Sequence, residues 1–315
     1  GEVTINLEQS SQYLSGLLLA APLAARPTRV EITGRKAVSW PYVSLTLQAM
    51  RDFGVPVVVE RHLGGNGATA WEPVDWREVR EATPGALRFR VEPARYQARD
   101  LHVEGDWSNA SYFLAAGAVG PGAVSVTGLR RDSFQGDKAL LGILEAMGAM
   151  ISWGETQDSS TGKGIPMITV TPGELRGIEV DMGASPDIVP TVAVVAALAQ
   201  GRTVIRNVAH LRIKESDRLA AVAGELTRLG CCVRVLDDGL DIQPNPEALA
   251  EIVSQGQAVD LRTHDDHRMA MCLSILERRG VPVRLDNPGC VAKSFPQFWE
   301  AWRRVVPATA HGTTS

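Results

Sequence analysis

The sequence has few of the features that mark secreted, metal-binding or membrane proteins. Only four of its 315 residues are cysteines, and none forms a C-x-x-C pair, which disfavours a zinc site. Cys231 and Cys232 are adjacent in a predicted strand, so we interpret the cysteines as buried free thiols of a reducing cytoplasm. No apolar run reaches the roughly 18 residues that a membrane span needs. The composition therefore predicts a soluble, cytoplasmic globular protein.

Charge of one sign and the common nucleotide motifs are also missing. The 32 basic and 36 acidic residues give a net charge of −4, so no overall field attracts nucleic acid or anionic lipid. The chain contains no G-x-S-x-G, Walker A or Rossmann motif, which disfavours hydrolase and nucleotide-dependent functions. The run Gly64–Gly67 lacks the strand and helix that a phosphate loop requires.

Internal repeats are the strongest pattern that is present. Four segments each begin with a polar cluster, continue as an apolar helix and end in alternating strand residues. They start at Ser10, Ser108, Ser185 and Asp265. A second pattern of polar opening, amphipathic helix, glycine stop and strand starts at Ser39, Asp132 and Ile213, with a shortened copy from Lys293. Alternating helices and strands predict an α/β layer architecture, with a hairpin loop over Gly64–Pro84 lengthening the first unit.

The polar clusters place candidate ligands at the beginnings of helices. Free backbone N–H groups and the positive end of the helix dipole make such positions suitable for anions. Serine and aspartate are also ordinary N-caps, so either role fits each single cluster. The serine-containing clusters are Ser10-Ser11-Gln12, Ser39-Trp40-Pro41-Tyr42 and Ser185-Pro186-Asp187. In the last one, Asp187 is either a second cap or a general base.

Cations near predicted helix starts favour the ligand interpretation. Lys214 and Arg218 are four residues apart, so on a helix they would share a face and repel unless an anion lies between them. Glu215 beside them is a candidate acid, although a solvated salt-bridged helix start also fits. Arg268 and Lys293 provide two further cations. Together with Arg218, they indicate one anionic pocket. A metal site at His264 and His267 lacks a convincing third ligand.

Seven motifs are distributed along nearly the whole chain. They are S-S-Q-Y-L-S-G-L-L-L-A-A-P-L-A, V-E-G-D-W-S-N-A-S-Y-F-L-A-A, Q-G-D, P-D-I-V-P, R-N-V-A-H-L-R-I-K-E-S-D-R, H-D-D-H-R-M-A-M and A-K-S-F-P-Q-F. Together these motifs resemble 5-enolpyruvylshikimate-3-phosphate synthases. They occur in the family's order up to about Val305, and the last three separate this family from UDP-N-acetylglucosamine enolpyruvyl transferases.

The resemblance implies a role for each candidate residue. Asp187 resembles the acceptor of the 5-hydroxyl proton, and Glu215 resembles the proton donor to the methylene of phosphoenolpyruvate. The implied phosphoenolpyruvate ligands are Gln12, Arg218, Arg268 and Lys293. The implied shikimate-3-phosphate ligands are Ser10, Ser11, Gln12, Ser39, Tyr42, Asp187, Asn207 and Lys214. The implied reaction adds the 5-hydroxyl to the vinyl carbon and then eliminates phosphate, as a step of aromatic amino acid biosynthesis, with no metal or organic cofactor.

The resemblance also implies an enolpyruvyl-transferase-like fold of repeated βαβαββ units in two domains. We expect residues 1–103 to be a partial domain on the shikimate-3-phosphate side, 104–305 to be a nearly complete second domain, and 306–315 to be a flexible tail. The family's opening K-S-x-[ST]-x-R and L-G-N-A-G-T runs are missing, so the fold is expected to be incomplete. Trp40 stands where the family usually has a basic residue, and its ring is a candidate wall of the cleft.

Three functions follow as alternatives. The first is the C-terminal portion of an active synthase whose missing segment is supplied by another chain or has been lost. The second is a non-catalytic fragment or degenerate homologue that only binds a phosphorylated ligand, and the third is an enolpyruvyl transferase with another acceptor. Because the acid, base and cations are all retained, the first is favoured. We expect the chain alone to be inactive. Its expected partners are the small-molecule substrates and a complementary N-terminal fragment, and it is expected to bind neither nucleic acid nor membrane.

Overall fold

The computed structural model describes residues 1–63, 70–79, 81–157, 162 and 164–306. These residues divide into two compact units. The first unit comprises residues 1–103 and 134–136, and the second comprises the rest of the described chain. The run Gly64–Gly67, part of the expected hairpin loop and the expected tail beyond Val306 lie outside the described residues.

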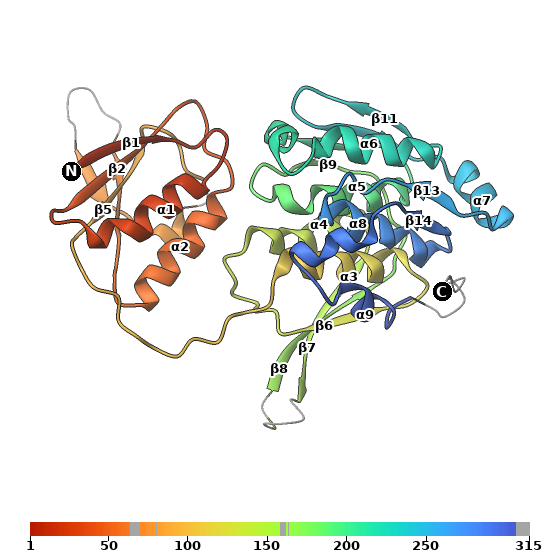
Figure 1. The fold of residues 1–315 in the computed structure, drawn as a ribbon, viewed down its shortest axis with the longest axis horizontal. Helices are drawn as coiled ribbons and strands as arrows, with labels where there is room; N and C mark the ends of the chain where they lie inside the picture. The colour runs from red at the N-terminus through yellow and green to blue at the C-terminus, as the bar shows by residue number, and fades with distance from the viewer. Residues whose placement is uncertain (64–69, 80, 158–161, 163, 307–315) are drawn as a thin grey trace. The chain divides into compact units, whose positions relative to one another are not determined.

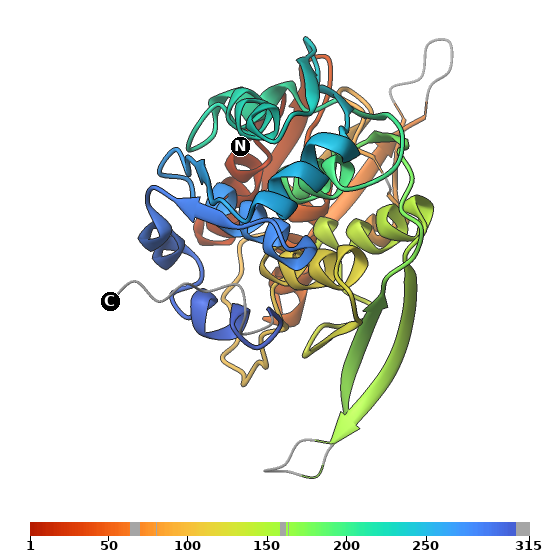
Figure 2. The same cartoon turned by 90° about the vertical axis from the view of Figure 1, so that its right-hand side faces the viewer.

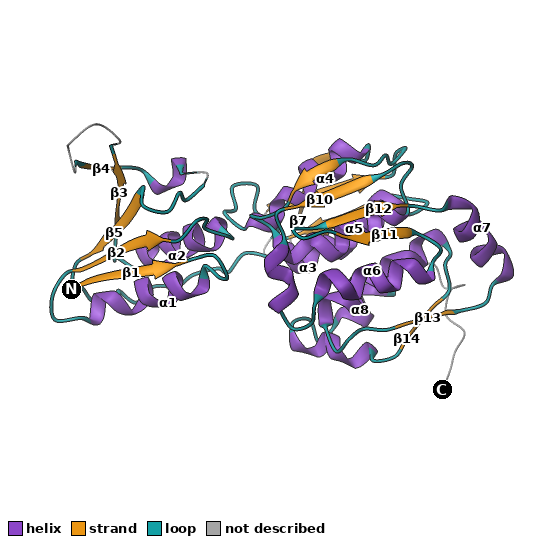
Figure 3. Cartoon of the chain, turned by 90° about the horizontal axis from the view of Figure 1, so that it is seen from above, coloured by secondary structure: helices purple, strands orange, loops and turns teal. Residues whose placement is uncertain are grey.

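The first unit is a mixed sheet covered by two helices (Figure 1). Its strand order is β1-β2-β5-β3-β4, in which β1 and β2 are parallel and the other neighbours are antiparallel. The strands are β1 Glu2–Asn6, β2 Thr28–Thr33, β3 Val58–His62, β4 Trp71–Pro73 and β5 Leu87–Val91. The helices α1 Gln12–Ala20 and α2 Trp40–Asp52 pack against each other on one side of the β1-β2-β5 sheet (Figure 3).

The second unit repeats this strand order. Its four-stranded sheet has the order β9-β10-β12-β11, with β9 and β10 parallel and the other neighbours antiparallel, as in β1-β2-β5-β3. These strands are β9 Glu179–Asp181, β10 Thr203–Arg206, β11 Cys232–Val235 and β12 Leu240–Gln243. The expected repeats are thereby confirmed at the level of topology.

The two remaining sheets contain parts of the same pattern. The order β6-β8-β7 matches the last three strands of a unit, and the parallel pair β13-β14 matches the first two. The β7-β8 hairpin extends beyond the helices of its unit (Figure 2). These strands are β6 Val124–Thr127, β7 Met150–Gln157, β8 Gly164–Thr171, β13 Val259–Leu261 and β14 Val283–Leu285.

Helices of the second unit surround a central apolar helix, α5 Val189–Ala197. Every residue of α5 is buried, and α5 contacts three other helices, as expected of a helix that is apolar on all sides. These are α3 Trp107–Val119, α6 Arg218–Arg228 and α8 His267–Leu273. The other helices are α4 Leu140–Met147, α7 Pro246–Gln255 and α9 Phe298–Trp302.

Short 3-10 helices place several of the polar clusters. They are η1 Ala21–Leu23, η2 Trp76–Glu78, η3 Gly136–Ala139, η4 Pro186–Ile188, η5 Ala209–Ile213, η6 Ser274–Arg279 and η7 Pro288–Lys293. The predicted glycine stops are confirmed, because Gly54, Gly148 and Gly230 follow α2, α4 and α6 with positive φ angles. A residue in this left-handed conformation ends a helix, and glycine adopts it without strain.

Two expectations about individual side chains are wrong. Trp40 is not a cleft wall, because its side chain is buried in the core of the first unit and its Nε1 donates to the Val79 carbonyl at 2.8 Å. A buried indole removes a large apolar area from water and needs only this one acceptor. Cys232 is exposed at the start of β11, whereas Cys231 and Cys272 are buried thiols as expected.

In the described part of the chain, none of the helices combines the length and the hydrophobicity that a membrane crossing requires.

Candidate functional site

Arg218 lies at the centre of a network of opposite charges in the second unit. Its side chain is 1% exposed, and its Nε donates to Asp266 Oδ2 at 2.8 Å. Its Nη1 donates to Asp187 at 3.0 Å and its Nη2 to Glu215 at 2.6 Å. Because burial of a guanidinium requires paired and hydrogen-bonded partners, these carboxylates explain why the charge can lie inside the protein.

Asp187 is held between two guanidinium groups. One carboxylate oxygen accepts from Arg218, and the other accepts from Arg268 Nη2 at 2.9 Å. Asp187 is on η4, directly before the apolar helix α5, and Arg268 is the second residue of α8. The packing of α5 against α8 therefore brings together two residues that are 81 positions apart in the sequence.

Glu215 joins the third cation, Lys293, to this network. Lys293 Nζ donates to Glu215 Oε1 at 2.8 Å, while Arg218 binds the other carboxylate oxygen. Burial acts to raise the pKa of Glu215, but the hydrogen bond from Lys293 and the charge of Arg218 outweigh it and lower the pKa to about 2. Glu215 is therefore a carboxylate in this arrangement. The network unites five of the predicted residues, namely Asp187, Glu215, Arg218, Arg268 and Lys293.

The helix starts that we expected at Lys214 and Lys293 are wrong. Lys214 does not share a helix with Arg218, because η5 ends at Ile213 and α6 begins at Arg218. Asp217 determines that start by accepting a hydrogen bond from the Ala220 amide as the N-cap. Lys293 also does not begin a helix: it is the last residue of η7, which precedes α9.

The predicted residues of the first unit lie at the starts of its two helices. Ser10 Oγ accepts from the backbone amide of Gln12, the first residue of α1, and Gln12 is exposed. Ser11 occupies the N-cap position but its side chain makes no capping hydrogen bond, and it is buried. Ser39 precedes α2 with a φ of 56°, and Tyr42 is partly exposed in the first turn of α2.

Asn207 belongs to the second unit but is bound to its own sheet. It follows β10 with a φ of 63°, and its side-chain amide donates to both carboxylate oxygens of Asp181 at 3.3 Å. Its backbone amide donates to Asp238 at 3.2 Å. Lys214 is partly exposed, and the roles of Asn207 and Lys214 as substrate ligands stay predictions.

The two histidines of the H-D-D-H run have separate environments. His264 Nε2 is 3.0 Å from Glu225 Oε1, whereas His267 is buried in the first turn of α8. Within the described ranges, no three His, Cys, Asp or Glu side chains are arranged to hold a metal ion.

Sequence reasoning missed two buried carboxyls near this network. Asp266 is 0% exposed; it caps α8 by accepting from the Arg268 amide at 2.9 Å and binds Arg218 through the same carboxylate. Asp137 is 2% exposed and accepts a hydrogen bond from the Ser108 hydroxyl. Asp266 lies in the motif H-D-D-H-R and Asp137 in the motif Q-G-D. Both motifs contributed to the family resemblance, and this was the only sequence signal that pointed to these two residues.

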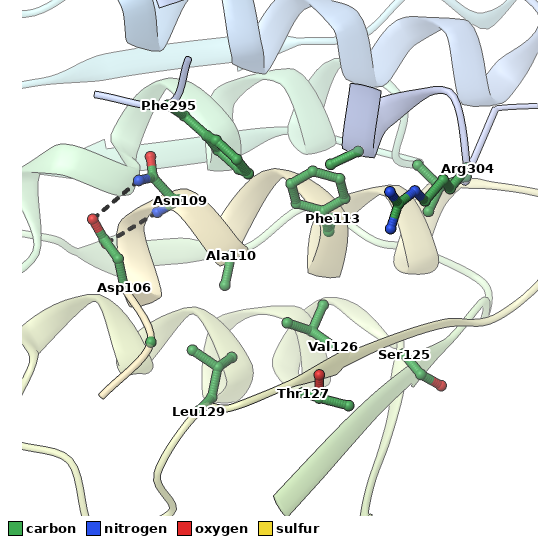
Figure 4. Close-up of a pocket in the computed structure, with 13 residues that line it drawn as sticks. Asp106, Asn109, Ala110, Phe113, Ser125, Val126, Thr127, Leu129, Phe295 and Arg304 are labelled. Atoms are coloured by element: carbon green, nitrogen blue, oxygen red, sulfur yellow. Dashed lines mark hydrogen bonds between the residues drawn. The ribbon is translucent and has the colours of Figure 1, made fainter. Parts of the chain in front are cut away.

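A separate cavity of about 480 Å³ lies beside α3, and Figure 4 shows the side chains that line it. Asp106 and Asn109 from the start of α3, Val126 from β6 and Phe295 contribute to its wall. None of the predicted site residues lines this cavity.

Comparison with solved structures agrees with the fold. The chain matches an EPSP synthase from Acinetobacter baumannii with a TM-score of 0.68 and 24% identity, covering 96% of this chain and 62% of that one. It matches the enolpyruvyl transferase NikO from Streptomyces tendae with a TM-score of 0.62 and 19% identity, covering 96% and 64%. The fold is therefore that of the enolpyruvyl transferases, as expected.

Sequence comparison identifies the family within this class. The model of the family "EPSP synthase (3-phosphoshikimate 1-carboxyvinyltransferase)" matches residues 1–67 and 78–302, and the chain belongs to this family. Curated 3-phosphoshikimate 1-carboxyvinyltransferases from Thiobacillus denitrificans and Edwardsiella ictaluri are 42% and 40% identical over 94% and 95% of the chain. The chain spans 61% and 60% of the lengths of these two relatives.

Proposed function

We propose that this chain is the acid-base and phosphoenolpyruvate-binding part of a 3-phosphoshikimate 1-carboxyvinyltransferase. The proposed reaction transfers the enolpyruvyl group of phosphoenolpyruvate to the 5-hydroxyl of shikimate-3-phosphate in the cytoplasm, in aromatic amino acid biosynthesis. The observation that supports it is the network in which Arg218, Arg268 and Lys293 surround Asp187 and Glu215. Family membership supports the proposed substrate class.

The three cations would hold the anionic groups of phosphoenolpyruvate. Arg218 and Arg268 can each bind a carboxylate or phosphate with two parallel hydrogen bonds, and Lys293 adds a point charge. Because these cations are paired with Asp187 and Glu215, a substrate anion would compete with both carboxylates for them. This competition would couple substrate binding to the ionisation of the acid and the base.

Asp187 would act as the base and Glu215 as the acid. Asp187 takes the proton of the 5-hydroxyl while the hydroxyl oxygen forms a bond to the vinyl carbon of phosphoenolpyruvate. Glu215 donates a proton to the methylene carbon. The resulting tetrahedral intermediate returns a methyl proton to the Glu215 carboxylate as its bond to the phosphate oxygen breaks, which releases phosphate and restores the vinyl group. The cations stabilise the charge that develops on the departing phosphate.

Glu215 can act as an acid only if substrate changes its surroundings. With a pKa of about 2 it carries no proton near neutral pH. When Lys293 and Arg218 bind a substrate anion instead, the carboxylate loses its stabilising partners and gains a negative neighbour. Both changes raise the pKa of Glu215, so substrate binding would itself favour protonation of this residue.

The remaining predicted ligands complete this proposal. The proposed shikimate-3-phosphate ligands are Ser10, Ser11, Gln12, Ser39, Tyr42, Asn207 and Lys214. Gln12 is also a proposed phosphoenolpyruvate ligand. We also propose that 1–103 is a partial domain and 104–305 a nearly complete one, and that a complementary N-terminal fragment is needed for turnover.

Phosphate release from the two substrates tests this function. The chain is assayed alone and with a separately produced polypeptide that covers the part of the Thiobacillus denitrificans relative outside the match. We expect turnover only in the second case, and loss of about 100-fold or more in Asp187→Ala and Glu215→Gln. Glu174→Gln is the matched control, because Glu174 is 80% exposed and pairs only with Arg176 among its described ion pairs.

Two results would contradict the proposal. Turnover by the chain alone at an ordinary enzyme rate would show that no further fragment is required. Activity that survives in both Asp187→Ala and Glu215→Gln would refute the assigned acid and base.

A further inference from the structure

Asp137 is a buried carboxyl that the proposed reaction does not use. It lies on η3, is 2% exposed, and its Oδ2 accepts a hydrogen bond from the Ser108 hydroxyl. Its Oδ1 is buried without a hydrogen-bond partner among the residues that the structure describes. A half-satisfied buried carboxyl is unfavourable for folding, so its presence calls for an explanation.

The first turns of α3 connect Asp137 to the charge network. Ser108 is the second residue of α3, and α3 contacts η4, which carries Asp187. One turn further along, the hydroxyls of Ser111 and Thr191 lie 3.1 Å apart and join α3 to α5. Asp137 and Asp187 therefore lie on segments that both contact α3.

The ionisable groups that act on Asp137 are Asp187, Arg268 and Asp106. Burial, followed by the negative charge of Asp187, raises the pKa of Asp137 to about 6. The hydrogen bond from Ser108 and the charge of Arg268 oppose this rise, and Asp106 adds to it. The two carboxyls thus influence each other's ionisation.

This influence is reciprocal. If the charge of Asp187 makes Asp137 hold its proton more tightly, then the charge of Asp137 makes Asp187 hold a proton more tightly by the same free energy. This increase in proton affinity matters for a base, because the guanidiniums of Arg218 and Arg268 favour the carboxylate form of Asp187 and weaken it as a proton acceptor.

We propose that Asp137 is a positioning residue whose negative charge strengthens Asp187 as the proton acceptor. This inference rests on the proposed function, which makes Asp187 the base. Asp137 contributes its charge without touching substrate, since its side chain is buried and faces Ser108. Its contribution is present above about pH 6 and disappears below that pH, where the carboxyl becomes neutral.

Carboxyl-carbon NMR of the whole chain, with ¹³C-labelled aspartate, tests the coupling without any need for activity. Asp137→Asn and Asp187→Asn assign the two signals. We expect Asp187 to titrate at a pH lower by about half a unit to one unit in Asp137→Asn, and Asp137 to titrate lower in Asp187→Asn. Ser108→Ala should move the Asp137 titration upward, because it removes a hydrogen bond that lowers the pKa of Asp137.

Asp132→Asn is the matched control, since the Asp132 side chain is 73% exposed and pairs with Arg130. It should leave the Asp187 titration unchanged. An Asp187 signal that does not move in Asp137→Asn would overturn the proposal, as would an Asp137 signal that titrates in the ordinary aspartate range near 3.8.

Kinetics of the complemented protein provide the second measurement. Asp137→Asn should lower kcat about three- to tenfold at pH 8 and less than about twofold at pH 5.5, with no rise in KM. An equal loss at both pH values, or a raised KM, would indicate a merely structural role and would overturn the proposal. If no variant or wild-type protein turns over, the proposed function fails, and the NMR titrations still decide whether the two carboxyls are coupled.

Discussion

Removing the charge of Arg218 should destabilise the second unit strongly. Arg218→Met keeps an unbranched apolar side chain but leaves the carboxylate of Asp266, which is 0% exposed, without its nearest cation. Breaking a buried ion pair on one side costs roughly 3–5 kcal/mol. Asp266 retains two donors, the Arg268 amide and the Ser216 hydroxyl, so we expect a loss of about 3 kcal/mol, at the lower end of that range.

Urea unfolding measures this loss. For a slope of about 3 kcal/mol per molar urea, the midpoint should fall by about 1 M. Trp107 and Trp302 are both buried in the second unit, so near-UV circular dichroism includes the unfolding of that unit, beside the signal of the buried Trp40 and Trp76 in the first unit. Arg304→Met is the matched control: its side chain is 75% exposed and pairs with Glu300 one turn away, so it should cost no more than about 0.5 kcal/mol.

A double variant identifies the cause of the loss. Asp266→Asn keeps an oxygen that can accept from the Arg268 amide but removes the charge, so Arg218→Met with Asp266→Asn should recover most of the lost stability. The coupling between the two sites should be about 2 kcal/mol. A loss below about 1 kcal/mol in Arg218→Met, or a double variant no more stable than the single one, would refute the reasoning.

Two further predictions concern charge and packing. Lys293→Met should raise the pKa of Glu215 from about 2 toward its ordinary value, because it removes the hydrogen bond that contributes most to lowering it; carboxyl-carbon NMR checks this, and titration still near pH 2 would contradict it. Since the pKa is lowered, the ionised form stabilises the fold above about pH 4.5, and this stabilisation is lost as the pH falls toward 2. Gly117→Ala should destabilise by about 1–3 kcal/mol, because an added Cβ would lie 2.6 Å from the Val170 carbonyl oxygen. Gly142→Ala in α4 meets nothing within 4 Å and should instead stabilise by up to about 1 kcal/mol, and thermal melts with the same sign for both would contradict this account.

The repeated units could be predicted because each carries its own local signals. Apolar stretches of helical length, alternating strand residues and a glycine after the second helix recur along the chain, and these are short-range patterns. The buried helix α5 and the endings at Gly54, Gly148 and Gly230 follow from them directly. The residues that carried the family resemblance likewise marked five members of the charge network.

The sequence could not show which of several possible interactions a side chain makes in the folded protein. The spacing of the sequence placed Lys214 and Arg218 on one helix. In the structure Asp217 is the N-cap and accepts from the Ala220 amide, so α6 begins at Arg218, after Lys214. Trp40 had the sequence position of a polar cleft residue, and burial of its ring was favoured instead. Asp137 is one acidic residue among many, and only tertiary packing buries it.

The agreement in strand order between repeats bears on how the chain acquires its structure. Every strand of the β1-β2-β5-β3 sheet, and every strand of the β9-β10-β12-β11 sheet, comes from a single stretch of sequence. No pairing has to wait for a distant part of the polypeptide, so little loop-closure entropy opposes each sheet. Each repeat can therefore mature as a cooperative folding step of its own, and during synthesis on the ribosome the β1-β5 sheet can form before the segments that carry Asp187 and Glu215 have emerged.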